Sequence, residues 1–146
     1  MSDLADPALP GLPAAPGAPG GRAPMNAGPS VLLVEDDLEL LGAIRASLRS
    51  RGCTVDAAAT GSEALRCILR GGYHAVITGT SLPRIDGMEL TRLLSRRVQS
   101  PCIVLLTSSS DPELLRQGYA AGATHVLSKP LSMTALARLL ENLAVP

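Results

Sequence analysis

The 146-residue chain contains no phenylalanine, no tryptophan and only two tyrosines, so it offers few rings on which nucleobases could stack. Its 13 basic and 13 acidic side chains balance, which removes the charge excess typical of nucleic-acid or membrane-surface binding. No apolar run approaches the ~20 residues that a membrane span requires. We therefore expect a cytoplasmic protein without a nucleic-acid or membrane partner.

Cysteine and histidine are also scarce. Cys53, Cys67 and Cys102 are odd in number and lack the close spacing of zinc ligands, so we expect buried free thiols in a reducing compartment. His74 and His125 have no carboxylate or cysteine at a useful spacing. We assign neither histidine a catalytic or metal-binding role.

The first 29 residues differ in composition from the rest. They hold seven of the twelve prolines, together with seven alanines and five glycines. Proline removes amide donors and glycine adds backbone freedom, so neither helix nor sheet is favoured there. The segment lacks the basic start and unbroken apolar stretch of a secretory signal. We interpret residues 1–29 as a disordered tail, with Met25 as an alternative start of translation, and residues 30–146 as one domain.

From Ser30 onward, apolar runs typical of strands alternate with helical patterns. Leu41, Ile44 and Leu48 have the three- and four-residue spacing of a helix face, and Asp111-Pro112 is typical of a helix start. The strands are predicted at residues 31–34, 53–57, 73–77, 102–106 and 124–127. Five alternating strand–helix units predict an α/β domain with a doubly wound, five-stranded parallel sheet.

In such a sheet, functional side chains gather where the carboxyl ends of the strands meet. Carboxylates, hydroxyls and the only lysine of the chain follow the predicted strands: Glu35, Asp36, Asp37, Thr78, Thr80, Ser81, Thr107, Ser108, Ser109 and Lys129. Mg²⁺ prefers carboxylate oxygens, and a hydroxyl and a lysine can hold phosphoryl oxygens. The set is typical of magnesium-dependent phosphoryl transfer, although the acidic run alone would also suit a solvated first helical turn.

Residues 30–146 resemble the receiver domain of two-component response regulators. VLLVEDD resembles the first strand and acid pair of that family, and SLPRIDG resembles its proline and Asp-Gly turn after the third strand. LLTS resembles the end of the fourth strand, and LSKPLS the lysine–proline motif after the fifth. The resemblance implies a flavodoxin-like (βα)5 fold and a role in phosphorelay signalling rather than enzymatic activity.

The resemblance also implies roles for individual residues. Glu35 and Asp36 correspond to the acid pair that holds Mg²⁺, with Asp36 as the direct ligand, and the backbone carbonyl of Ser81 would complete the metal shell. Thr107 corresponds to the switch hydroxyl that closes on the phosphoryl group, and Lys129 to its positive partner.

Two positions depart from the family pattern. Gly79 stands where the phosphoaccepting aspartate is expected, and Val126 stands where a switching Tyr or Phe is common. An acyl phosphate needs a carboxylate nucleophile, which glycine lacks, so Gly79 is not phosphorylatable. No cofactor is then required, and any Mg²⁺ binding is expected to be weak. Without the aspartate we expect Lys129 to pair with Asp36, and we expect Asp37 to cap the first helix.

The favoured interpretation is a phosphorylation-independent pseudo-receiver that acts by contact with a sensor kinase or a downstream regulator. No output domain follows the last predicted helix in this sequence, so any effect is expected to pass through a partner or a homodimer. The resemblance places the contact face on the fourth helix, fifth strand and fifth helix: Leu114, Arg116, Tyr119, Val126, Leu136, Arg138 and Glu141.

Two alternatives remain open. One is a receiver that is phosphorylated on another residue, such as Asp36 or Asp37. The other is a regulatory domain that binds a small polar ligand at the hydroxyl-rich rim. The sequence does not identify the cognate kinase, the partner, the pathway or the oligomeric state.

Overall fold

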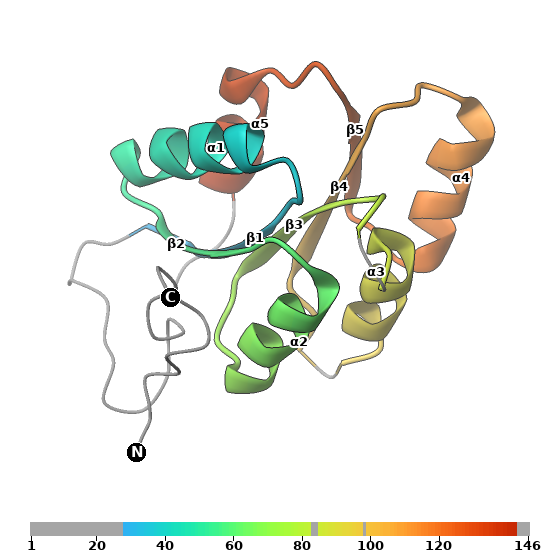
Figure 1. Ribbon diagram of the computed structural model, residues 1–146, viewed down its shortest axis with the longest axis horizontal. Helices are drawn as coiled ribbons and strands as arrows, with labels where there is room; N and C mark the ends of the chain where they lie inside the picture. Colours follow the sequence, from blue (N-terminus) through green and yellow to red (C-terminus); the bar gives the residue numbers. More distant parts are fainter. Residues whose placement is uncertain (1–27, 83–84, 98, 143–146) are drawn as a thin grey trace.

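The computed structural model describes residues 28–82, 85–97 and 99–142, so residues 1–27 of the predicted tail lie outside the described part. The described chain alternates strands and helices (Figure 1). The strands are β1 (Ser30–Val34), β2 (Thr54–Ala58), β3 (Ala75–Gly79), β4 (Cys102–Thr107) and β5 (His125–Ser128). The helices are α1 (Leu38–Ser50), α2 (Gly61–Arg70), α3 (Gly87–Ser95), α4 (Pro112–Ala121) and α5 (Met133–Glu141).

The strands form one parallel sheet, as the alternating pattern predicted, and their order in the sheet is β2-β1-β3-β4-β5. Helices α1 and α5 cover one face of the sheet, and α2, α3 and α4 cover the other (Figure 1). The order of the strands reverses between β1 and β3, where Val34 lies opposite Thr78. This switch point brings the segments after β1 and β3 together.

Two apolar cores lie on the two faces of the sheet. Leu41, Ile44 and Leu48 of α1 are buried against one face, as their spacing predicted. Cys67 of α2 is buried in the other core, whereas Cys53 and Cys102 are only half-buried, and all are free thiols. Among the described helices, none is both long and apolar enough to pass through a bilayer.

The helix starts follow the predicted capping chemistry. The Asp37 carboxylate accepts hydrogen bonds from the backbone amides of Glu39 and Leu40 at 3.1 and 3.2 Å, so Asp37 caps α1 as expected. Asp111 caps α4 in the same way, with Pro112 at the first helical position. These caps fix where α1 and α4 begin, just after β1 and β4.

Candidate functional site

Glu35 is the first residue after β1, and its side chain turns into the protein. Its backbone amide donates to the carbonyl of Ala58 at 3.0 Å, which holds it beside the end of β2. The Glu35 side chain is 2% exposed, whereas Asp36 lies on the surface. Two neighbouring acids of one motif therefore occupy different environments.

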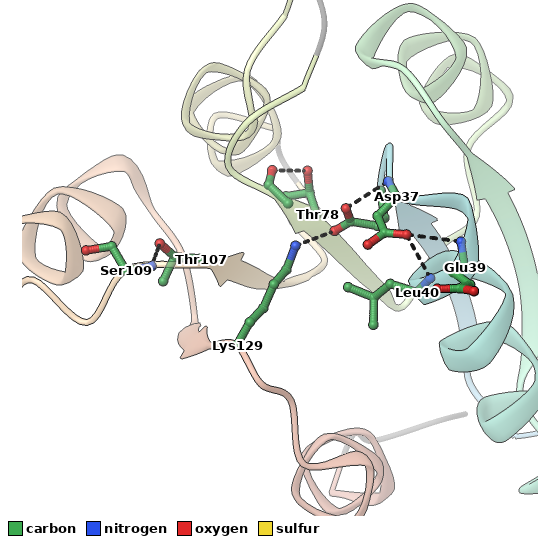
Figure 2. A network of polar contacts seen from close by, with 9 residues as sticks. Asp37, Glu39, Leu40, Thr78, Thr107, Ser109 and Lys129 are labelled. Atoms are coloured by element: carbon green, nitrogen blue, oxygen red, sulfur yellow. Dashed lines mark hydrogen bonds and ion pairs between the residues drawn. The ribbon is translucent and has the colours of Figure 1, made fainter.

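The buried carboxylate of Glu35 pairs with Lys129. Lys129 Nζ lies 3.2 Å from Glu35 Oε1, and Oε2 accepts from the Asp37 backbone amide at 3.1 Å. Figure 2 shows Lys129 reaching from the end of β5 toward this carboxylate. The expected pairing of Lys129 with Asp36 is wrong, because Glu35 points into the rim and Asp36 points out to solvent.

Gly79 ends β3 next to this pair. A Cβ atom built on Gly79 would lie 3.0 Å from Glu35 Oε1, so the glutamate carboxylate lies directly against the space of a side chain at this position. The φ angle of Gly79 is not in the positive range, so the backbone does not require glycine here. A larger residue would fit if the flexible end of Glu35 shifted slightly.

The lysine is held in place by its backbone. The Lys129 amide donates to the carbonyl of Thr107 at 2.7 Å, and the following Lys129–Pro130 peptide bond is cis. The side chain of Thr107 has a different partner from its carbonyl. Its hydroxyl accepts a hydrogen bond from the Ser109 amide at 3.1 Å (Figure 2). Thr107 is 1% exposed, so its hydroxyl is fixed inside the turn after β4.

The other predicted hydroxyls lie in different environments. Thr78 is fully buried and donates to the carbonyl of Gly79 at 2.9 Å. Ser81 is exposed and Thr80 half-buried. Gly87 lies close to this loop: its amide donates to the Thr80 carbonyl at 3.0 Å, and a Cβ atom at Gly87 would collide with the Gly79 carbonyl oxygen. Nothing in this arrangement favours the predicted site for a small polar ligand at the rim.

The donor set at the rim fits Mg²⁺ poorly. Both oxygens of Glu35 are engaged by Lys129 and by the Asp37 amide, which leaves the exposed carboxylate of Asp36 as the other member of the acid pair. Among the described residues there is no group of three His, Cys, Asp or Glu side chains that could hold a metal ion. A divalent cation here would have to displace the lysine from Glu35.

A second buried acid was not anticipated from the sequence. Asp56 of β2 is fully buried, and the Tyr73 hydroxyl donates to its Oδ2 at 2.6 Å, while Oδ1 has no partner among the described atoms. Burial raises the pKa of Asp56 to about 6, against the opposing effect of the Tyr73 hydrogen bond. The sequence did contain a signal for this buried acid, because Asp56 is the only charged residue in the strand TVDAA.

The predicted partner face combines packed and exposed residues: Leu114 is half-buried, and Arg116, Tyr119, Arg138 and Glu141 are exposed. Leu136 is fully buried and Val126 is 9% exposed, so both belong to the core. Tyr119 is 51% exposed, and its hydroxyl accepts from the Val126 backbone amide at 3.3 Å on the edge strand β5. Tyr119 is therefore a surface side chain whose hydroxyl also binds a backbone amide of the edge strand.

The five-stranded parallel (βα)5 sheet carries an acid–lysine pair, Glu35 and Lys129, at its carboxyl edge. The family model for the response regulator receiver domain matches residues 31–141. The chain belongs to this family, which places it in two-component signalling.

Known relatives agree with this assignment. The transcriptional regulatory protein AfsQ1 of Streptomyces coelicolor is 35% identical over 103 residues, which cover 70% of this chain and 45% of the relative. This chain spans about half the length, or less, of the curated relatives that it matches.

Solved receiver structures have the same fold. The receiver domain of the sensor histidine kinase PA1611 from Pseudomonas aeruginosa, solved with magnesium in its active-site cleft, is 32% identical with a TM-score of 0.72, covering 80% of this chain and 98% of that one. The receiver of the Saccharomyces cerevisiae regulator Ssk1, solved with the phosphotransfer protein Ypd1, is 25% identical with a TM-score of 0.71, covering 78% and 87%.

Proposed function

We propose that this chain is a phosphorylation-independent receiver domain that signals through protein contact. The observation that carries the proposal is the position of Glu35, whose carboxylate lies against the side-chain space of Gly79 and pairs with Lys129. The glutamate supplies a fixed negative charge to the lysine, in the place where a phosphorylatable aspartate would stand.

The chemistry of the rim supports this proposal. A phosphoryl acceptor needs a nucleophilic oxygen, and Gly79 offers no side chain. Lys129, which would otherwise stabilise the transferred group, is already neutralised by Glu35 at 3.2 Å. The Thr107 hydroxyl is held by the Ser109 amide and would have to break that hydrogen bond to reach a phosphoryl group.

The metal requirement of phosphoryl transfer is also poorly met. Mg²⁺ would neutralise charge on the phosphoryl donor and orient it. In this chain Asp36 is the carboxylate free to bind the ion, because Glu35 is committed to Lys129 and Asp37 to the helix cap. We therefore expect signalling that does not depend on Mg²⁺.

A protein partner is the natural recipient of such a signal. Ssk1, a receiver of the same fold, forms a complex with a histidine phosphotransfer protein. For this chain we propose a contact surface on α4, β5 and α5, used for a sensor kinase, a downstream regulator or a second copy. The half-exposed ring of Tyr119 supports it, because an amphipathic aromatic side chain suits a protein contact.

Intact mass spectrometry tests the proposal directly. The full chain and the Gly79→Asp variant would be incubated with acetyl phosphate and Mg²⁺, with Gly79→Asn as the matched variant that fills the same space without a nucleophile. We expect a phosphoryl group on Gly79→Asp alone, because the aspartate restores the acceptor and the carboxylate can displace Glu35 from Lys129.

The other outcomes are equally informative. A phosphoryl group on the natural chain would overturn the proposal, and peptide mapping would then show whether Asp36 or Asp37 is the acceptor. If Gly79→Asp stays unmodified although it folds, the rim lacks more than its nucleophile.

A further inference from the structure

A recess lies at the amino edge of the sheet, opposite the edge that carries Glu35 and Lys129. It is a cavity of about 740 Å³, close to the volume of many small-molecule sites, which run from about 300 to 1,000 Å³. It lies where β3 and β4 begin, because His74 directly precedes β3 and Pro101 directly precedes β4. The ends of α2 and α3 complete its wall: Ile68, Gly71, Leu94 and Arg96.

The charge of this cavity has one sign. Arg96 and Arg97 line it, and its described lining contains no carboxylate. The whole chain is neutral, with 13 basic and 13 acidic side chains, so a local pair of guanidinium groups without an acid is a departure from the average surface. Guanidinium groups bind carboxylates and phosphates through paired, charge-assisted hydrogen bonds.

His74 contributes a defined hydrogen-bond donor. The backbone amide of Ser30 donates to His74 Nδ1 at 3.0 Å, so this nitrogen is an acceptor. The proton of the neutral ring is then on Nε2, which makes His74 a donor toward an anion. The ring is also fixed, because the Ser30 hydroxyl lies 2.9 Å from the same nitrogen and the His74 amide donates to the Ser30 carbonyl at 2.9 Å.

The remaining wall is apolar and firmly held. Tyr73 lines the cavity, and its hydroxyl is tied to the buried carboxylate of Asp56 at 2.6 Å, so the ring cannot swing away easily. Ile68, Val76 and Leu94 lie on the same wall. A ligand with an apolar body would find contacts there that an inorganic anion would not use.

We propose that this cavity binds a small organic anion, a carboxylate or a phosphate monoester with an apolar body. The anionic group is bound by Arg96, Arg97 and the Nε2 proton of His74, and the body lies against Tyr73. This ligand would bind at the amino edge of the sheet and is independent of phosphorylation at the carboxyl edge. The receiver would thereby respond to a small molecule through the β3 and β4 strands that join the two edges.

Isothermal titration and amide NMR spectra of the full chain test this proposal. Phenyl phosphate and benzoate are the probes, with inorganic phosphate as an anion without a body and phenol as a body without an anion. We expect at least one of the first two to bind with a Kd of about 1 mM or tighter, and the last two to bind about tenfold more weakly. The relative affinities of phenyl phosphate and benzoate distinguish the two anionic groups.

Matched double variants locate the site. Arg96→Gln/Arg97→Gln should weaken binding about tenfold, because two charge-assisted contacts are lost. Arg116→Gln/Arg138→Gln removes the same charge from exposed positions on α4 and α5, and it should leave binding within about twofold. Amide shifts should appear at Tyr73, His74 and Arg96.

Three results would overturn the proposal. They are no binding of either organic probe at about 10 mM, equal losses in the two double variants, and amide shifts confined to the rim around Lys129. Arg116 pairs only with Glu113 on the surface, and Arg96, Arg97 and Arg138 are exposed. We therefore expect both double variants to fold, so that a change in affinity reports on the site itself.

Discussion

Glu35 Oε1 lies 3.2 Å from Lys129 Nζ, across 94 residues of sequence. The same oxygen lies 3.0 Å from the position that a Cβ atom of residue 79 would occupy. The glutamate thus has two neighbours at once, a cation and the empty side-chain space of a glycine. A carboxylate on residue 79 would compete for both, because like charges at this distance repel and the lysine can serve only one of them fully.

The first prediction concerns the strength of this ion pair. Lys129→Met should lower the free energy of unfolding by about 2 kcal/mol, because it leaves the Glu35 carboxylate, 2% exposed, without its counter-ion. Glu35→Gln should cost less, since Lys129 is 29% exposed and can turn to water. Urea unfolding of both single variants and the double variant gives the coupling energy.

The surface pair Arg51–Glu141 is the control for that cycle. Its atoms are 3.7 Å apart and its side chains are 42% and 63% exposed, so its coupling should stay below about 0.5 kcal/mol. If the two cycles give the same coupling energy, the Glu35–Lys129 contact has no special role at the rim. The proposed locking of Lys129 would then lose its energetic support.

The second prediction is a pH dependence set by Asp56. Its pKa of about 6 in the folded protein is above the ordinary value of 3.8, so the folded state holds this proton more tightly than the unfolded chain. Stability should therefore be greatest below about pH 4 as far as this group is concerned, fall as the pH rises to about 6, and stay level above it. The contribution amounts to at most about 3 kcal/mol.

Two variants isolate this effect. Asp56→Asn should flatten the stability curve between about pH 4 and pH 6, because the titrating group is gone. Tyr73→Phe should lower stability most above that range, since it removes the hydroxyl that stabilises the carboxylate. Arg49 and Arg70 also act on Asp56 electrostatically, and Cys67 lies beside Tyr73. An unchanged slope in Asp56→Asn would show that other groups cause the pH dependence.

The third prediction concerns the turn that covers Gly79. Gly87→Ala should cost about 2–3 kcal/mol, because the new methyl group would meet the carbonyl oxygen of Gly79, which is backbone and cannot move aside cheaply. Gly42→Ala is the matched change within α1, where the added carbon would meet no atom within 4 Å apart from its chain neighbours and the backbone of its own helix. It should raise stability by about 0.5–1 kcal/mol, because alanine favours the helix. Equal effects of the two changes in urea unfolding would contradict the crowding at Gly87.

Much of the fold was predictable because its signals are local. Leu41, Ile44 and Leu48 show the helix face by spacing alone, and the buried strands appear as short apolar runs. The caps at Asp37 and Asp111 were also readable, because a capping side chain bonds amides only two or three residues away. The predicted strand bounds lie within two residues of those observed.

The sequence by itself thus determined the parallel α/β fold, the rim on which the acids and the lysine gather, and the absence of a side chain at Gly79. Only the tertiary structure decided that Glu35, and not Asp36, pairs with Lys129. That choice depends on which side chain the chain turns inward just after β1, and on the space left free at Gly79. The bond between Asp56 and Tyr73 has the same origin, since burial and contact across strands are properties of the packed sheet and not of local spacing.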